Sequence, residues 1–166
     1  MEKQFNMNIE DSALFIYGEG GHRAQMNRLM KRIGGEINKN KISLSDYKIK
    51  EEWSDKHYVT REFRNKYSTF TSVLRFNQLH QIKVCLKIHK THRIKVVVST
   101  GPGVALIPAF YFKYIVGAKI IHLETWSRFE TKSFTGRIMS LIADEFYVQH
   151  KSLLKQYKKA KFSGVL

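Results

Sequence analysis

Two side chains in this sequence of 166 residues are suited to proton transfer, and each stands shortly after a predicted strand. His22 follows the pair Gly20-Gly21, and a histidine with an ordinary pKa of about 6.5 can accept a hydroxyl proton near neutral pH. Glu124 follows an apolar run, where a carboxylate could orient a substrate hydroxyl or serve as an alternative base. It could equally be a helix cap or an ion-pair partner of Arg128. We therefore treat His22 and Glu124 as the candidate catalytic residues.

A second set of residues is suited to binding phosphate or diphosphate groups. The Arg128 guanidinium offers a fork of N–H donors that matches phosphate oxygens. Ser133 and Thr135 are most simply helix caps, although the exposed N–H groups at a helix start also bind phosphate. Glycines let the backbone come close to a ligand, although glycine pairs are common in turns that bind nothing. The candidate acceptor- and diphosphate-binding residues are Gly20, Gly21, Gly101, Gly103, Arg128, Ser133 and Thr135.

The elements that would position these residues alternate between strand and helix. Apolar runs predict strands at 12–17, 41–44, 56–60, 94–98, 119–123 and 145–148, and a polar loop at 45–55. Helical spacing predicts helices at 23–33, 68–90, 103–116 and 133–142, followed by a basic helix at 150–158. This alternation predicts an α/β fold, a Rossmann-like three-layer sandwich with a mainly parallel sheet. Ligands bind such sheets at the carboxyl ends of the strands, where both sets of candidates stand.

The long helix predicted at 68–90 carries apolar residues at helical spacing, and we expect these to face the core. The expected inward residues are Phe70, Val73, Leu74, Leu79, Ile82 and Leu86. Three lysines, Lys83, Lys87 and Lys90, share a flanking face of the same helix.

Length and composition indicate one domain at 12–166 after a polar extension at 1–11. With 43% hydrophobic and 13% aromatic residues, the chain can bury a core. The single cysteine, Cys85, excludes an internal disulfide and fits a reducing compartment. The polar start shows no signal-peptide pattern. The longest apolar run, 104–116, contains Lys113 and is shorter than the roughly 20 residues that cross a membrane.

The formal net charge of +15 indicates an anionic partner, and nucleic acid, anionic lipid and a diphosphate ligand all fit it. The excess lies mainly in the second half, because residues 84–166 contain 14 basic and 4 acidic side chains. The aromatic run at 104–116 is most simply core, and the C-terminal lysines are most simply a solvated face. Together they are typical of a membrane-surface face. The candidate membrane-surface residues are Lys151, Lys155, Lys158 and Lys159.

Metal chemistry has little support in the sequence. Cys85, His89 and His92 have a C-x3-H-x2-H spacing, but no second thiol pair accompanies them as in zinc sites, so we assign no metal ligand. The sequence also lacks a G-x-S-x-G elbow, a P-loop lysine and the Asp-x-Asp metal motif of the other large sugar-transferase fold. Protein groups and helix dipoles would then stabilise a leaving diphosphate.

The order of these motifs resembles one family. In the order of its motifs, the chain resembles the acceptor-binding subunit of split lipid-linked sugar transferases. These motifs are the turn Gly20-Gly21-His22, the segment 99–103, Glu124 with Ser127-Arg128, and the segments 133–137 and 143–149. That family includes the membrane-recruiting half of the dolichol-pathway N-acetylglucosaminyltransferase and its bacterial PssD/CpsF-type relatives. The resemblance covers about 14–166. More loosely, the chain is similar to the amino-terminal domain of MurG.

The resemblance implies an enzyme subunit that forms half of a GT-B glycosyltransferase. Such an enzyme needs two facing Rossmann-like domains, so a separate nucleotide-sugar-binding chain would complete it. The implied reaction transfers a sugar with inversion from a UDP-sugar, bound mainly by that partner, to a polyprenyl-diphosphate-linked sugar, without a cofactor. It would take place at the cytoplasmic face of the membrane, with this chain bound peripherally, in capsule, exopolysaccharide or O-antigen-type synthesis.

The resemblance also implies where acceptor and partner bind. The turn at 20–22 would lie against the acceptor's diphosphate and first sugar, with His22 as the base. The partner would bind near the apolar C-terminal segment, and the candidate interface residues are Phe162, Val165 and Leu166. The polar start departs from the eukaryotic relatives, which carry an amino-terminal membrane helix, so we expect the bacterial form. The alternative is a basic nucleic-acid-binding α/β module, although no DNA- or RNA-reading motif stands out.

Overall fold

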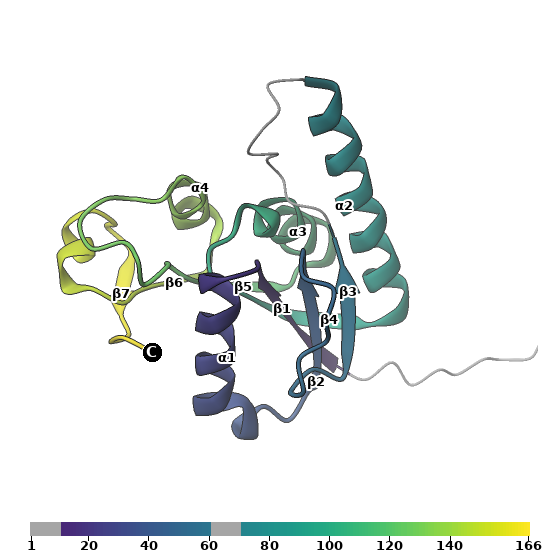
Figure 1. The fold of residues 1–166 in the computed structure, drawn as a ribbon, viewed down its shortest axis with the longest axis horizontal. Coiled ribbons are helices and arrows are strands. Elements are labelled where there is room, and N and C mark those ends of the chain that lie inside the picture. The colour runs from purple at the N-terminus through teal and green to yellow at the C-terminus, as the bar shows by residue number, and fades with distance from the viewer. Residues whose placement is uncertain (1–10, 61–70) are drawn as a thin grey trace, which may run out of the picture.

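The structure is a computed structural model that describes residues 11–60 and 71–166, the side chains of 71–77 excepted. Its centre is a seven-stranded sheet in the order β3-β2-β1-β4-β5-β6-β7 (Figure 1). Every strand pairing in the described part of the chain is parallel. The strands are β1 (Asp11–Tyr17), β2 (Asn40–Ser45), β3 (Lys56–Val59), β4 (Arg93–Ser99), β5 (Lys119–Leu123), β6 (Glu145–Val148) and β7 (Ala160–Phe162).

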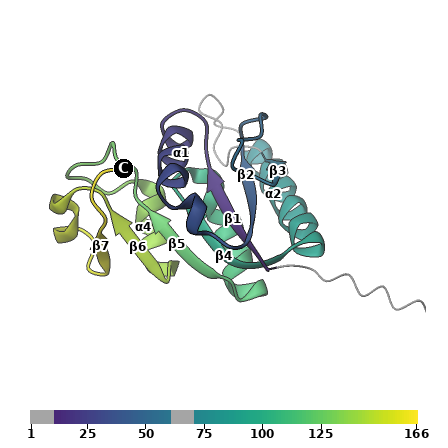
Figure 2. The same cartoon turned by 90° about the horizontal axis from the view of Figure 1, so that it is seen from below.

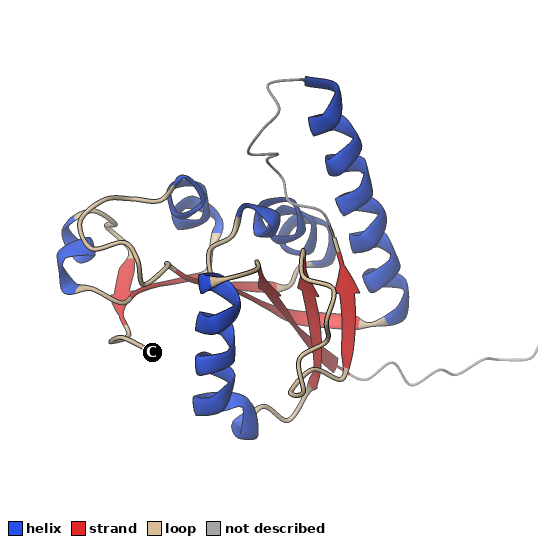
Figure 3. Cartoon of the chain, in the orientation of Figure 1, coloured by secondary structure: helices blue, strands red, loops and turns tan. Residues whose placement is uncertain are grey.

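Helices cover both faces of this sheet, as Figures 2 and 3 show. Helix α1 (Gly21–Ile33) lies on one face, and α2 (Thr71–Thr91), α3 (Leu106–Tyr111) and α4 (Phe134–Ile142) lie on the other. Strand β1 is buried on both sides, which explains its unbroken apolar sequence. Leu14 and Ile16 join the core beneath α2, α3 and α4, whereas Phe15 and Tyr17 pack against α1. The expected Rossmann-like three-layer sandwich is therefore confirmed.

The strand order reverses direction at the centre of the sheet. Chain connections run outward from β1 through β2 to β3, and outward from β4 through β5 and β6 to β7. The loops that follow β1 and β4 therefore leave this switch point toward helices on opposite faces of the sheet. Such a switch point is where open parallel sheets bind their ligands. It places the turn at 18–22 next to the segment at 100–103.

Most predicted elements agree with the structure within a few residues, but the basic helix predicted at 150–158 is wrong. A short 3-10 turn, Lys151–Lys155, is followed by β7, which pairs with β6 at the edge of the sheet. Leu153 and Tyr157 are buried and fix this segment to the core. A strand of three residues is too short to show an alternating pattern, so no local pattern predicts a strand there. The helix predicted at 103–116 is present as three consecutive pieces: a 3-10 turn (Gly103–Ala105), α3, and a π-helical turn (Phe112–Val116).

The inward face predicted for α2 is also wrong over its described part. Leu79, Ile82 and Leu86 are 56%, 40% and 43% exposed. The buried residues are Gln81, Cys85 and Ile88, at helical spacing on another side. Apolar residues occupy two sides of this helix, so their spacing did not identify the side that packs on the sheet. Phe70 and the side chains of Val73 and Leu74 lie outside what the structure describes.

Candidate functional site

The loops after β1 and β4 are joined through His22. Its ring Nδ1 donates a hydrogen bond of 2.7 Å to the carbonyl oxygen of Thr100, and the Thr100 hydroxyl donates back to the His22 carbonyl at 3.1 Å. A carbonyl oxygen only accepts, so Nδ1 carries the proton in the neutral ring and Nε2 carries the basic lone pair. The half-buried His22 side chain is therefore held in the tautomer that a proton acceptor needs.

Gly101 allows these two loops to approach one another. Its backbone has φ of +102°, which side-chain-bearing residues rarely adopt. A Cβ atom at this position would lie 3.3 Å from His22 Cε1 and 3.6 Å from the backbone nitrogen of Thr125. The loops after β1, β4 and β5 thus meet at this glycine. Of the predicted diphosphate-binding residues, Gly20 and Gly21 begin α1 beside it, and Gly103 opens the turn that follows.

Glu124, at the end of β5, is completely buried. Its Oε1 accepts hydrogen bonds from the Ser133 hydroxyl at 2.8 Å and from the Thr125 N–H at 3.0 Å. Its Oε2 accepts from the Tyr157 hydroxyl at 2.5 Å. Burial and the neighbouring carboxylate raise the pKa of Tyr157 well above its ordinary value, so this hydroxyl stays protonated and donates. These bonds favour an orienting and capping role for Glu124 over that of a base.

The Glu124 carboxylate also organises the start of α4. Ser133 is the N-cap of this helix, and its hydroxyl oxygen accepts from the Gly136 N–H at 2.8 Å while donating to Glu124. Glu124 therefore lies at the positive end of the helix dipole. Only glycine fits at position 136, because a Cβ there would overlap Glu124 Oε2 and lie 2.5 Å from the Tyr157 hydroxyl. Thr135 is buried in the same turn, so Ser133 and Thr135 face inward.

Two glutamine side chains hold the backbone at the end of β5. The Gln25 and Gln149 amides, both buried, donate to the carbonyl oxygen of Glu124 at 3.3 Å and 3.0 Å. The next residues are held as well: Gln25 Oε1 accepts from the Trp126 N–H at 3.4 Å, and His150 Nε2 donates to the Trp126 carbonyl at 2.8 Å. The loop 124–128 is therefore fixed at its base beside the start of α1.

Arg128 lies further out on this loop and is exposed. Its guanidinium donates to the Thr131 hydroxyl at 3.3 Å, and it is not among the partners that the structure gives to Glu124. It is thus accessible to a ligand at the rim of the site. Predicted interface residues Phe162 and Val165 are exposed, and Leu166 is half-buried against Arg28 and Gln149. The four predicted surface lysines are all exposed.

His122, two residues before Glu124, is completely buried beneath the site. Its ring stacks on Phe146 with centroids 5.1 Å apart. Desolvation lowers its pKa to about 3, so the ring is neutral and contributes packing at physiological pH.

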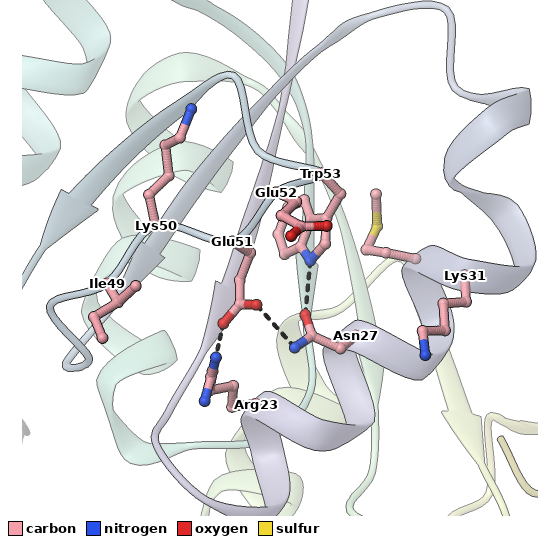
Figure 4. Close-up of a pocket in the computed structure, with 9 residues that line it drawn as sticks. Arg23, Asn27, Lys31, Ile49, Lys50, Glu51, Glu52 and Trp53 are labelled. Carbon is pink, nitrogen blue, oxygen red and sulfur yellow. Dashed lines mark hydrogen bonds and ion pairs between the residues drawn. The ribbon is translucent and has the colours of Figure 1, made fainter.

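A cavity of about 510 Å³ lies between α1 and the loop at 49–53 (Figure 4). Arg23 and Asn27 on α1 both bind the Glu51 carboxylate, and the Trp53 indole donates to Asn27 Oδ1 at 2.7 Å. The polar groups satisfy one another, so this network fastens the loop to α1.

Cys85, His89 and His92 contact different partners. Cys85 is buried, and burial raises its thiol pKa to about 12. His89 Nδ1 bonds to the Tyr111 hydroxyl and His92 Nε2 to the Tyr58 hydroxyl, each at 2.9 Å. Within residues 11–60 and 71–166, no cluster of three metal-binding side chains occurs.

The sequence analysis assigned no site role to Gln25, Trp126 and Tyr157, and it included Gln149 only as part of the segment 143–149. Glutamine, tryptophan and tyrosine carry no pattern that distinguishes a site from a surface. His22 and Glu124 were identified because each follows a predicted strand. Gln149 and Trp126 also follow predicted strands, so the same criterion could have identified them.

Replacing Gly136 with alanine should displace Glu124 and Tyr157 from their shared hydrogen bond. We expect the free energy of unfolding in urea to fall by about 1–3 kcal/mol, as for other overpacked sites. The matched control is Gly35→Ala, because a Cβ at 35 has nothing within 4 Å and should change stability by less than about 1 kcal/mol. A Gly136→Ala variant as stable as the parent would contradict the buried cluster.

Residues 13–166 match the family described as oligosaccharide biosynthesis protein Alg14 like. The chain is 28% identical to the UDP-N-acetylglucosamine transferase subunit ALG14 of Kluyveromyces lactis, over 95% of this chain and 80% of that protein. It is 26% identical to the human protein of the same name, over 92% of this chain and 82% of that one. The relative in Candida albicans is 25% identical over all of this chain and 83% of its own length.

Two solved structures share the fold. MurG of Acinetobacter baumannii superimposes with a TM-score of 0.60 at 13% identity, over 84% of this chain and 41% of MurG. A UDP-N-acetylglucosamine 2-epimerase superimposes with a TM-score of 0.66 at 10% identity, over 93% of this chain and 48% of the epimerase. The chain thus spans somewhat less than half of each, and the expected half of a GT-B fold is confirmed. Because the family match extends over nearly the whole sequence, the chain belongs to the Alg14-like family of oligosaccharide biosynthesis proteins.

Proposed function

We propose that this chain is the acceptor-binding subunit of a two-chain transferase that uses UDP-N-acetylglucosamine. The relatives named as subunits of UDP-N-acetylglucosamine transferases support this donor and the need for a second chain. The observation that carries the proposal is the His22–Thr100 hydrogen bond, which holds a basic nitrogen at the switch point of the sheet. A separate nucleotide-sugar-binding chain would complete the enzyme.

The proposed reaction joins an acceptor hydroxyl to the anomeric carbon of the donor sugar with inversion. The hydroxyl oxygen attacks that carbon, the bond from the carbon to UDP breaks, and UDP leaves with the electron pair. The hydroxyl proton passes to His22 Nε2, the ring nitrogen that carries the lone pair. Glu124 takes no proton in this scheme; it holds the loop after β5 in place.

The acceptor's diphosphate would bind at the amino end of α1. Backbone N–H groups at Gly20 and Gly21 begin this helix, and its first turn contains no acidic side chain. Gly101 brings a third stretch of backbone close to them, and the exposed Arg128 would bind a phosphate oxygen from the rim. Ser133 and Thr135 would act indirectly, since both are buried around Glu124.

The polyprenyl chain of the acceptor calls for contact with a membrane, and two separate surfaces suit it. None of the helices in the described ranges is long and apolar enough to span a bilayer. Helices α2 and α3 contact one another, and exposed apolar side chains lie on both and on the π-helical turn Phe112–Val116 that follows α3. We call these residues the α2–α3 face: Leu79, Ile82, Leu86, Phe110, Tyr114 and Ile115. Three lysines of α2 are also exposed: Lys83, Lys87 and Lys90.

The C-terminal lysines, Lys151, Lys155, Lys158 and Lys159, belong to the other end of the sheet, beside β7 and away from α2 (Figure 1). The sequence analysis predicts one membrane-surface face from these lysines and the aromatic run 104–116. However, four residues of that run are buried in the core: Val104, Ala105, Leu106 and Phe112. We propose the α2–α3 face as the main contact with an anionic cytoplasmic leaflet, because it offers apolar and cationic groups together. Capsule, exopolysaccharide or O-antigen-type synthesis stays our prediction for the setting. Nucleic-acid binding has no support from the relatives.

Replacing His22 with asparagine should lower kcat of the two-chain enzyme by roughly 10²-fold or more, because asparagine keeps polarity but cannot accept the proton. The KM for the acceptor should change little. His89→Asn is the control, since His89 is exposed next to the amino end of β4, at the opposite edge of the sheet. Parent-like turnover by His22→Asn would mean that His22 only positions the substrate.

Replacing Ile82 and Leu86 together with serine should weaken binding to vesicles containing phosphatidylserine by more than 10-fold, because each buried apolar side chain contributes about 1.5–3 kcal/mol. The matched control replaces Ile49 and Val59 with serine, because they are 61% and 41% exposed away from this face. Sedimentation with vesicles measures the change. If only replacement of the four C-terminal lysines by glutamine reduced binding, the α2–α3 face would not be the contact.

A further inference from the structure

The C-terminal tail, residues 163–166, and the loop 124–128 share two side chains. We infer that Arg28 and Gln149 are positioning residues that couple the tail to this loop, so that a partner docked on the tail alters the acceptor site. The inference about the partner rests on the proposed function. The coupling within this chain does not.

Gln149 forms the first link. Its side chain is buried, and one amide group contacts both segments. Oε1 accepts from the backbone N–H of Leu166 at 3.1 Å, and Nε2 donates to the carbonyl oxygen of Glu124 at 3.0 Å. Because a planar amide moves as one unit, a shift of the tail that turns the Gln149 amide must also change its bond to Glu124.

Arg28, on α1, forms the second link. Its Nη1 donates to the main-chain oxygen of Leu166 at 3.2 Å, and its guanidinium carbon lies 4.7 Å from the centre of the Trp126 ring. This cation–π contact positions a side chain whose backbone is already held by Gln25 and His150. Trp126 Nε1 also lies 3.8 Å from where a Cβ on Gly21 would be, so it borders the proposed diphosphate site.

A partner can contact the exposed side chains at the C-terminal end of the chain, because the tail backbone forms its hydrogen bonds with the rest of the domain. Val165 in the tail and Phe162 at the end of β7 are 51% and 44% exposed, whereas the backbone of Leu166 bonds to Arg28 and Gln149. Gly164, at φ +77°, gives the turn between them. Lys151 lies over the Phe162 ring at 5.5 Å and Lys161 is exposed, so the fitting partner surface is apolar with acidic groups at its edge.

The test within the single chain follows Trp126 directly. With both tryptophans labelled as 5-fluorotryptophan and Trp126 assigned through Trp126→Phe, fluorine NMR reports on the ring that Arg28 contacts. Removing residues 164–166 should shift this resonance in the parent and produce little further shift in Arg28→Ala with Gln149→Leu. Arg28→Ala alone should show an intermediate response if the double variant does not fold. An unchanged resonance in the truncated parent, or the same shift in both backgrounds, would overturn the coupling.

The partner arm uses inorganic pyrophosphate as the diphosphate probe. In the parent, pyrophosphate should tighten partner binding about 5-fold or more, and the partner should tighten pyrophosphate binding by the same factor, because coupling is reciprocal. The double variant should bind the partner but lose this factor. Arg32→Ala, one turn further along α1 and exposed, should keep it. Equal coupling in the double variant would overturn the inference even if sugar transfer by the enzyme were established.

Discussion

The fully buried carboxylate of Glu124 holds together the chain segments at the carboxyl end of β5. A charged group removed from water must be surrounded by donors, since leaving it unpaired costs several kcal/mol. The chain supplies them from Thr125, Ser133 and Tyr157, and leaves position 136 without a side chain. These bonds tie the end of β5 to the start of α4 and to the segment before β7. They fix two connections of the sheet, β5–β6 and β6–β7, at the carboxyl ends of the strands.

The functional geometry follows from that fixed edge. Once the backbone at Glu124 is held, Gln25 and Gln149 have a carbonyl to bind, and Trp126 is placed beside the start of α1. Thr125 then meets the glycine turn after β4, which in turn holds His22 through Thr100. In the proposed function, a structural carboxylate and a basic histidine thus serve the same site in different ways. The first keeps the loops in register, and the second offers a basic nitrogen.

The sequence predicted the architecture well because β1 and the second half of β4 are buried, so each appears as an apolar run whose glycine turn marks the switch point. The site was predicted only in part. Position after a strand identified His22 and Glu124, but the burial of Glu124 depends on Ser133 and Tyr157, 9 and 33 residues further along the chain. Such long-range pairing leaves no local pattern. β7 was missed because it has three residues, and the face of α2 because Leu79 and Cys85 are both apolar but lie on different sides.

The central claim is that this chain supplies the acceptor side of an enzyme completed by a second chain. The most direct measurement is transfer of labelled N-acetylglucosamine from UDP-N-acetylglucosamine to a polyprenyl-diphosphate-linked sugar, with each purified chain alone and with both together. We expect product only from the combined chains, and loss of that product when His22 is replaced by asparagine. Transfer by this chain alone, or full activity of the partner without it, would show that this chain is not the acceptor-binding half of the enzyme.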